Sequence, residues 1–374
     1  MMQRAILFMS IILFFTACGE NQKIRPSSKV IKVGVLAPQS GVSEKLGMQS
    51  LLGLNAAKKM NKYLKNGDEI IFEIMDTASD INSTKNAFSK LLKKDIKIFI
   101  SFMNTTDTKA MSDEFKNHKV PIISTLATDN NITSLDGYLT QVCIDNNTQV
   151  LVASHYILDE KFIENVGIIY DKTSLYSTSL ANGFNKYHTE LGGKIEFILD
   201  MSSKDSITKF KEQDKSKIKM LFNATSTKIS TKVLKMMHDE NYKFQMLATD
   251  GLFSSALMLK KDELKLFDGV YVIGHYAHNV NKTNKRLHLE KLLDKDGLKD
   301  SSYAFLAYDG YQLLVYALEN CSGYNTKCIN SIMQNSDVIN GLSGNFTMID
   351  SKARREVYVD KIQDSQLIKE VVIY

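Results

Sequence analysis

The sequence predicts an α/β protein of two doubly wound parallel-sheet lobes joined by a three-segment hinge, and two observations carry this prediction. Short runs rich in β-branched and apolar residues alternate with helix-like stretches along most of the 374 residues. Such alternation is typical of βαβ units, in which helices cover both faces of a parallel sheet. The short runs also fall into two successive sets of five, which favours two sheets over one large sheet.

The predicted strands and helices can be placed along the chain. The two sets of strands are 30–37, 69–75, 96–101, 120–124 and 138–144, then 165–170, 194–199, 218–222, 244–248 and 269–274. Between the first two strands, apolar residues recur every fourth position at Met48, Leu52, Ala56, Met60 and Leu64, which predicts that this stripe is one face of a helix over 45–65. From about Phe346 the pattern changes to short strands without helices, which we expect to extend the second sheet in antiparallel fashion.

The first residues predict export. Arg4 precedes an apolar run over 5–16 that ends at Ala17-Cys18. The run is shorter than the roughly 20 apolar residues that span a bilayer, and its layout fits a secretory signal peptide. Cys18 after Phe-Thr-Ala resembles a bacterial lipobox, although Phe15 replaces the usual Leu. We therefore expect residues 1–17 to be removed, Cys18 to be lipidated, and the polar segment 18–29 to tether the protein to a membrane on the periplasmic side of the cell envelope. The alternative is an ordinary signal peptide with an incidental cysteine.

Charge and cysteine content narrow the class of protein. The formal charge of +5 comes from lysines interspersed with acids, so a nucleic-acid partner is not expected. Cys321 and Cys328 lie close enough in the chain to form a disulfide in an oxidising compartment. Cys143 lies in an apolar alternating segment and is expected to be a small buried residue.

Several segments together resemble the type I periplasmic binding proteins, in particular the leucine/isoleucine/valine-binding group of ABC transporter lipoproteins. They are, in order, IKVGVLAPQSG, VPIISTLATDNNIT, LATDGLFSS, LFDGVYVIGHYA, SSYAFLAYDGYQLLVYALENC and INGLSGNFTMID. The resemblance implies that 30–145 plus 278–342 form the first lobe, and 146–277 plus 343–374 the second. It also implies crossings between the lobes near 144–147, 276–279 and 341–345.

Loops beyond the carboxyl ends of parallel strands are the usual place for a ligand. Thr105 and Thr106 follow such a strand and precede a helix, where free N–H groups and a hydroxyl suit a carboxylate; the simpler interpretation is that Thr105 caps the helix. The resemblance implies that Thr105 and Thr128 hold the carboxylate and ammonium of an amino acid, and that Ala127 offers its carbonyl.

The second lobe is expected to supply an acid and an aromatic ring. Asp250, before Gly251, matches the acidic residue that pairs with the ligand ammonium in amino-acid-binding relatives, although Asp-Gly is also a common turn. Tyr176 matches the tyrosine that closes over the ligand. Leu46 and the segment 223–225 depart from the family's aromatic residues, which puts a branched-chain ligand in doubt.

Enzyme activity is not expected. The phosphate-loop, dinucleotide, zinc-protease and nucleophile-elbow motifs do not occur in the sequence, and no cofactor or metal is implied. His275 and His278 are better explained by packing at a crossing between lobes than by metal binding. Two functions follow: capture of a small solute for ABC permease subunits in the membrane, or a lipoprotein of the same fold that senses a ligand or regulates envelope enzymes.

Overall fold

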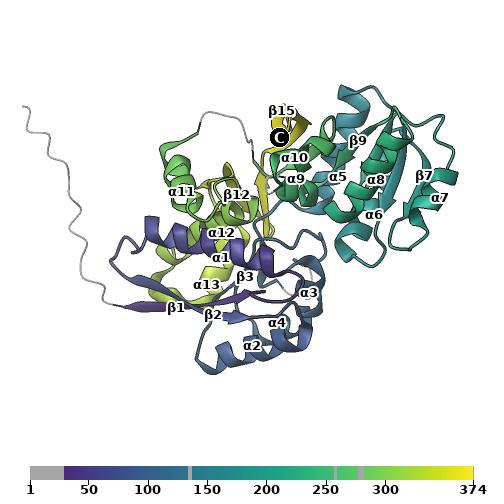
Figure 1. Cartoon of the computed structure of the whole chain (residues 1–374). Coiled ribbons are helices and arrows are strands. Elements are labelled where there is room, and N and C mark those ends of the chain that lie inside the picture. The colour runs from purple at the N-terminus through teal and green to yellow at the C-terminus, as the bar shows by residue number, and fades with distance from the viewer. Residues whose placement is uncertain (1–28, 134–136, 257–258, 277–281, 374) are drawn as a thin grey trace, which may run out of the picture.

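The protein is described here from a computed structural model that covers residues 29–133, 137–256, 259–276 and 282–373 (Figure 1). The predicted signal peptide, the predicted lipidation site Cys18 and nearly all of the predicted tether lie outside these residues. Within the described ranges, no helix combines the length and the apolar character needed to cross a membrane.

Two mostly parallel sheets organise the chain, as predicted. The eight-stranded first sheet runs β11 (Ile339–Asn340), β12 (Asn345–Ile349), β13 (Lys352–Arg355), β5 (Leu139–Gln141), β4 (Ile122–Ser124), β3 (Phe99–Ser101), β1 (Val30–Ala37) and β2 (Glu69–Asp76). The seven-stranded second sheet runs β15 (Gln366–Ile373), β14 (Val357–Gln363), β10 (Tyr271–Gly274), β9 (Gln245–Ala248), β8 (Met220–Asn223), β6 (Asn165–Tyr170) and β7 (Lys194–Asp200). All ten predicted strands are present, some of them shorter than expected.

Each sheet and its helices form one lobe, and the two lobes lie side by side (Figure 1). The first lobe contains α1 (Glu44–Met60), α2 (Ile81–Lys93), α3 (Thr105–Ala110), α4 (Ser112–His118), α11 (Asn284–Asp294), α12 (Ser302–Glu319) and α13 (Thr326–Gln334). The second contains α5 (Asn146–His155), which continues as one π-helical turn (Tyr156–Glu160), with α6 (Leu175–Glu190), α7 (Ser206–Glu212), α8 (Thr227–Asp239), α9 (Asp250–Ala256) and α10 (Lys261–Leu264).

The buried face of α1 differs from the predicted apolar stripe. Of the predicted stripe, Met48 is 41% exposed, Leu52 and Met60 are half-buried and pack against the core, and Ala56 is buried. The fully buried leucines, Leu51 and Leu54, lie beside this stripe. The reason is Gly53, where a Cβ atom would come within 2.3 Å of the Ala304 carbonyl oxygen. Close contact with α12 through this glycine turns the helix away from the face that spacing alone predicts.

The carboxyl-terminal strands correct the predicted division of the chain. The segment 343–374 was expected to belong entirely to the second lobe, but β12 and β13 pair with the first sheet, and only β14 and β15 join the second. The third crossing therefore lies at Glu356, between β13 and β14, and not at 341–345. The first crossing follows β5 as expected, and the predicted second crossing lies partly outside the described residues.

A buried ion pair explains this placement. Arg355, the last residue of β13, donates from Nη2 to Oδ2 of Asp309 on α12 over 2.9 Å, and the two side chains are 1% and 0% exposed. Asp309 also accepts a hydrogen bond from the backbone N–H of Leu342 at 2.6 Å and one from the Ser343 hydroxyl. The pair thus holds the loop before β12 and the end of β13 on the first lobe.

The cysteines predicted to pair lie next to each other. The structure joins Cys321 to Cys328, and their Cα atoms are 5.9 Å apart, within the usual range for a disulfide. Cys143 is a buried free thiol, and burial raises its pKa, so it is expected to be unreactive.

Breaking the ion pair should unfold the protein more readily. Arg355→Met leaves Asp309 buried without its cation, which costs about 3–5 kcal/mol. Urea denaturation should show this loss as a lower midpoint with an unchanged slope. Arg354→Met, at an exposed neighbour in the same strand, is the control and should change the free energy of unfolding by less than about 0.5 kcal/mol. An equal effect of both substitutions would contradict a special role for the pair.

Asp360 in β14 should make stability depend on pH. Burial raises the pKa of this carboxyl to about 7, although the nearby charge of Lys369 opposes the shift, and neither side-chain oxygen has a hydrogen-bond partner among the described residues. The folded pKa exceeds the unfolded value near 4, so the contribution to stability is complete below about pH 4 and is lost as the pH rises through 7. Asp360→Asn should therefore become more stable than the wild type as the pH rises from 4 to 7, and the difference should level off above 7. Thermal melts across this pH range test the prediction. Asp364→Asn, in an exposed turn, is the control and should show the same dependence of Tm on pH as the wild type. Parallel curves of Tm against pH for the wild type and Asp360→Asn would refute the prediction.

Candidate ligand-binding site

Asp250 lies at the centre of a buried hydrogen-bond network in the second lobe. It follows β9 as the first residue of α9 and is 7% exposed. Its Oδ1 accepts a hydrogen bond from the Tyr176 hydroxyl at 2.5 Å, and its Oδ2 lies 3.1 Å from Nε2 of His275. Its backbone N–H donates to Oε1 of Gln149 on α5 over 3.2 Å.

The network keeps Asp250 charged despite its burial. Burial acts to raise the pKa of the carboxyl, but the hydrogen bond and charge of His275 and the hydrogen bond of Tyr176 outweigh it, so the pKa is lowered. Burial and the charge of Asp250 raise the pKa of Tyr176 well above its usual value. The site therefore presents an anionic carboxylate beside a neutral phenol.

Gly251 allows the tyrosine to approach. Its N–H donates to the Tyr176 hydroxyl over 3.1 Å, and a Cβ atom at this position would lie 3.0 Å from the same oxygen. The Thr249 hydroxyl is also 2.8 Å from that oxygen. The Asp-Gly pair is thus explained by close approach of a side chain, and Asp250 is not merely a turn residue.

Thr105 and Thr128 meet in the first lobe. Thr105 Oγ1 accepts a hydrogen bond from the Thr128 N–H at 3.1 Å, and both residues are buried. The helix cap is supplied instead by Asn104, whose side chain accepts from the Asp107 N–H at 2.9 Å. The interpretation of Thr105 as a cap is therefore wrong, and its hydroxyl retains a proton to donate.

The first turn of α5 connects the two groups. The Asn146 N–H donates to the Thr128 carbonyl over 2.8 Å, and three residues later Gln149 contacts Asp250. The lobes also touch where α3 packs against α6 and where the Ser302 hydroxyl of α12 donates to that of Ser254 on α9 at 2.5 Å. Residues that are far apart in the sequence are thus brought to one region between the lobes.

Several buried polar atoms in this region have no hydrogen-bond partner among the described residues. They are Thr128 Oγ1, the side-chain nitrogen and oxygen of Asn146, Gln149 Nε2 and His275 Nδ1. Buried polar groups in folded proteins are nearly always hydrogen-bonded. A concentration of unpaired donors and acceptors beside a buried carboxylate therefore points to a polar ligand.

Other predicted residues are less suited to contact a ligand. The Ala127 carbonyl already accepts from Gln141 Nε2 at 2.7 Å and from the Cys143 thiol at 3.3 Å. Thr106 is exposed on α3. Asn223, expected to polarise the pocket, instead bonds Ser230 and Thr225 within its own lobe.

Sequence reasoning missed three members of the region, namely Asn146, Gln149 and His275. His275 directly follows β10 and was attributed to packing at a crossing, but its ring contacts the Asp250 carboxylate. Its position directly after a predicted strand, beside the strand that ends two residues before Asp250, was the available signal. Among the described residues, no group of three or more His, Cys, Asp or Glu side chains is arranged to hold a metal ion.

Comparison with known proteins identifies the family and the fold. The family model described as periplasmic binding protein matches residues 30–366. The leucine-binding protein LivK of Thermotoga maritima superposes with a TM-score of 0.80 at 19% identity, over 92% of this chain and 98% of its own. A solute-binding protein of an ABC transporter from Rhodopseudomonas palustris, in complex with p-hydroxybenzoic acid, gives a TM-score of 0.80 at 18% identity, over 92% and 97%. LivJ of Streptococcus pneumoniae, in complex with isoleucine, gives 0.74 at 17%, over 92% and 98%. Curated protein sequences give no match, so the likeness to individual proteins is one of fold.

Proposed function

The chain belongs to the family of periplasmic binding proteins, which are solute-binding proteins and not enzymes, and on this premise we propose that it captures an amino acid or a close relative between its lobes for delivery to an ABC importer. One observation supports the proposal most strongly. Asp250 is buried and ionised, and near it lie buried side-chain donors without a hydrogen-bond partner among the described residues, such as those of Asn146 and Gln149 in the first turn of α5. An anion and a set of donors together complement a zwitterion.

The residues near Asp250 and those near Thr105 and Thr128 would each bind a different group of the ligand. A ligand ammonium next to Asp250 would share the carboxylate with His275, whose ring already contacts it, and would add a charge-assisted hydrogen bond. A ligand carboxylate would accept hydrogen bonds from the Thr105 and Thr128 hydroxyls and from Nε2 of Gln149. Tyr176, held at 2.5 Å from Asp250, would lie against the ligand from the second lobe.

The relatives narrow the choice of ligand. Among the similar structures, some hold isoleucine and others hold aromatic acids such as p-hydroxybenzoic acid. Both ligand types carry a carboxylate, but only the amino acid carries an ammonium. A negative Asp250 at the site repels a simple carboxylic acid and attracts an α-ammonium, so it favours an amino acid.

The place of action follows from the first residues. We propose that Cys18 is lipidated and that the protein is tethered on the periplasmic side of a membrane, where it would meet the permease subunits. A lipid at Cys18 would keep the folded part near the importer while leaving the lobes free to close. Hinge closure around a ligand is the motion expected of two lobes joined by three short crossings.

A thermal-shift screen tests the proposed ligand class. Ligand that binds the folded state raises its stability by about 2.7 kcal/mol at a concentration one hundred times the Kd. We expect α-amino acids to raise the Tm, and their decarboxylated amines, their deaminated acids and benzoates to have no effect. A Tm raised by benzoates and not by amino acids would refute the zwitterion site.

The role of Asp250 is tested by Asp250→Asn. Removing one member of a buried charge pair costs on the order of 2–5 kcal/mol of binding, so calorimetry with the amino acid found in the screen should show affinity at least about thirtyfold lower. Because the carboxylate is buried and bonded to Tyr176 and His275, the free energy of unfolding should also fall by about 1–3 kcal/mol. Asp262→Asn, at an exposed acid in the same lobe, is the control and should bind as the wild type does. Equal affinity of wild type and Asp250→Asn would show that no ammonium pairs with this carboxylate.

A further inference from the structure

Three of the four connections that enter β2, β3, β4 and β5 at their amino ends are strongly basic; the fourth, 125–138 before β5, contains no lysine and two acids. Counted from the last helical turn to the next strand, the connections 57–68, 90–98 and 115–121 contain ten lysines and only two acids. They lead into β2, β3 and β4, which are parallel to β1 or to each other. Together with Lys29, which precedes β1, they form one surface, called here the amino-end face.

The second lobe provides an internal comparison. Its equivalent connections, 157–164, 187–193, 209–219, 236–244 and 265–270, contain eight lysines and nine acids. Lysines are favoured near helix carboxyl ends because they compensate the helix dipole, and that effect applies to both lobes alike. The excess of lysines on the amino-end face therefore has another cause.

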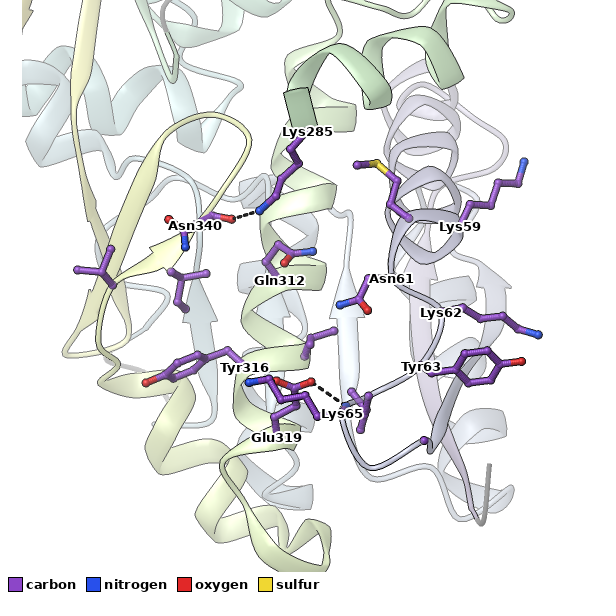
Figure 2. A pocket seen from close by; sticks show the side chains of 16 residues that line it. Lys59, Asn61, Lys62, Tyr63, Lys65, Lys285, Gln312, Tyr316, Glu319 and Asn340 are labelled. Atoms are coloured by element: carbon purple, nitrogen blue, oxygen red, sulfur yellow. Dashed lines mark hydrogen bonds and ion pairs between the residues drawn. The ribbon is translucent and has the colours of Figure 1, made fainter. Parts of the chain in front are cut away.

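The charge of this face is available to a partner. Lys59, Lys90, Lys93 and Lys116 are exposed and form no ion pair with the rest of the described chain. At one end of the face, a pocket of about 890 Å³ is lined by Lys59, Lys62, Lys65 and Lys285 (Figure 2). Its one acid, Glu319, is already paired with Lys65 at 2.8 Å, so the pocket keeps a net positive charge.

The chain also enters the fold at this face. The described structure begins at Lys29, directly before β1, and β1 begins at the end of the first lobe that lies away from the second (Figure 1). Twenty-eight residues precede Lys29 in the sequence. Any attachment of the protein through this segment, including the proposed lipid on Cys18, therefore reaches the fold at the amino-end face.

From these observations we infer that the amino-end face docks on an anionic phospholipid bilayer. Each lysine near such a surface increases the affinity for the membrane about fivefold. This contribution declines with distance from the surface over about one Debye length. Ligand-binding residues lie at the opposite, carboxyl ends of the strands, so a docked protein turns its ligand site away from the bilayer, toward incoming solute. The inference rests on the proposed location in the cell envelope, but not on the identity of the ligand.

Vesicle flotation tests the docking directly. A chain from Asn21 to Tyr374 keeps every described helix and strand and cannot be lipidated at Cys18, so lipid insertion does not contribute. It should bind vesicles that contain about one-third phosphatidylglycerol in phosphatidylcholine, and should not bind vesicles of phosphatidylcholine alone. Binding should be lost at about 0.5 M NaCl, because salt screens exposed charges. Equal binding to both vesicles, or none to either, would overturn the inference.

A pair of matched variants identifies the face. Lys59, Lys90, Lys93 and Lys116 changed together to Gln should weaken binding to the anionic vesicles at least about tenfold. The control changes Lys204, Lys217, Lys228 and Lys235 to Gln, which are exposed in the second lobe, and removes the same charge; it should weaken binding less than about threefold. Equal losses would indicate attraction by net charge alone and would overturn docking through this face. Circular dichroism and the ligand-induced Tm shift are measured on the same samples, so failure of docking and failure of ligand binding are read separately.

Discussion

The buried pair of Asp309 and Arg355 is the constraint on which the two-lobed arrangement depends. Arg355 is the last residue of the first sheet before the chain crosses to the second lobe at Glu356. An isolated charge in this position would cost several kcal/mol, so each partner requires the other. Because Asp309 also holds the backbone of Leu342, one carboxylate fixes both ends of the β12–β13 hairpin. The position at which the chain leaves the first lobe is thereby set.

The ligand site depends on a second connection, the first turn of α5. This turn follows the first crossing and bonds Thr128 on one side and Asp250 on the other. A ligand that engages both groups would therefore act on the hinge itself as well as on the two lobes. A ligand that binds the closed form more tightly than the open form shifts the population toward the closed form. Contacts with this turn would let the ligand favour closure directly at the hinge.

The sequence alone predicted the positions of the strands and helices, but it did not predict which of them pack or pair with one another. Alternation of strands and helices located all ten parallel strands because it depends on local periodicity, which each segment carries in its own residues. The sequence pattern assigned β12 and β13 to the wrong sheet, because the ion pair between Arg355 and Asp309, which are 46 positions apart, holds them on the first sheet. It misjudged the face of α1 because the close approach at Gly53 comes from Ala304. In the candidate site, the resemblance pointed to Asp250 and Tyr176, whereas His275 and Gln149 were not predicted because only the fold brings them to the carboxylate.

The direction of the strands links the two proposed functions of the first lobe. In a parallel sheet, every crossover helix begins at the carboxyl edge and ends at the amino edge, so the two edges differ in chemistry throughout. Here the carboxyl edge carries Asp76, Asp107 and Asp145 together with the polar ligand residues, and the amino edge carries the lysines and receives the start of the chain. Under both proposals, this one topology would place solute capture and membrane contact at opposite ends of the strands.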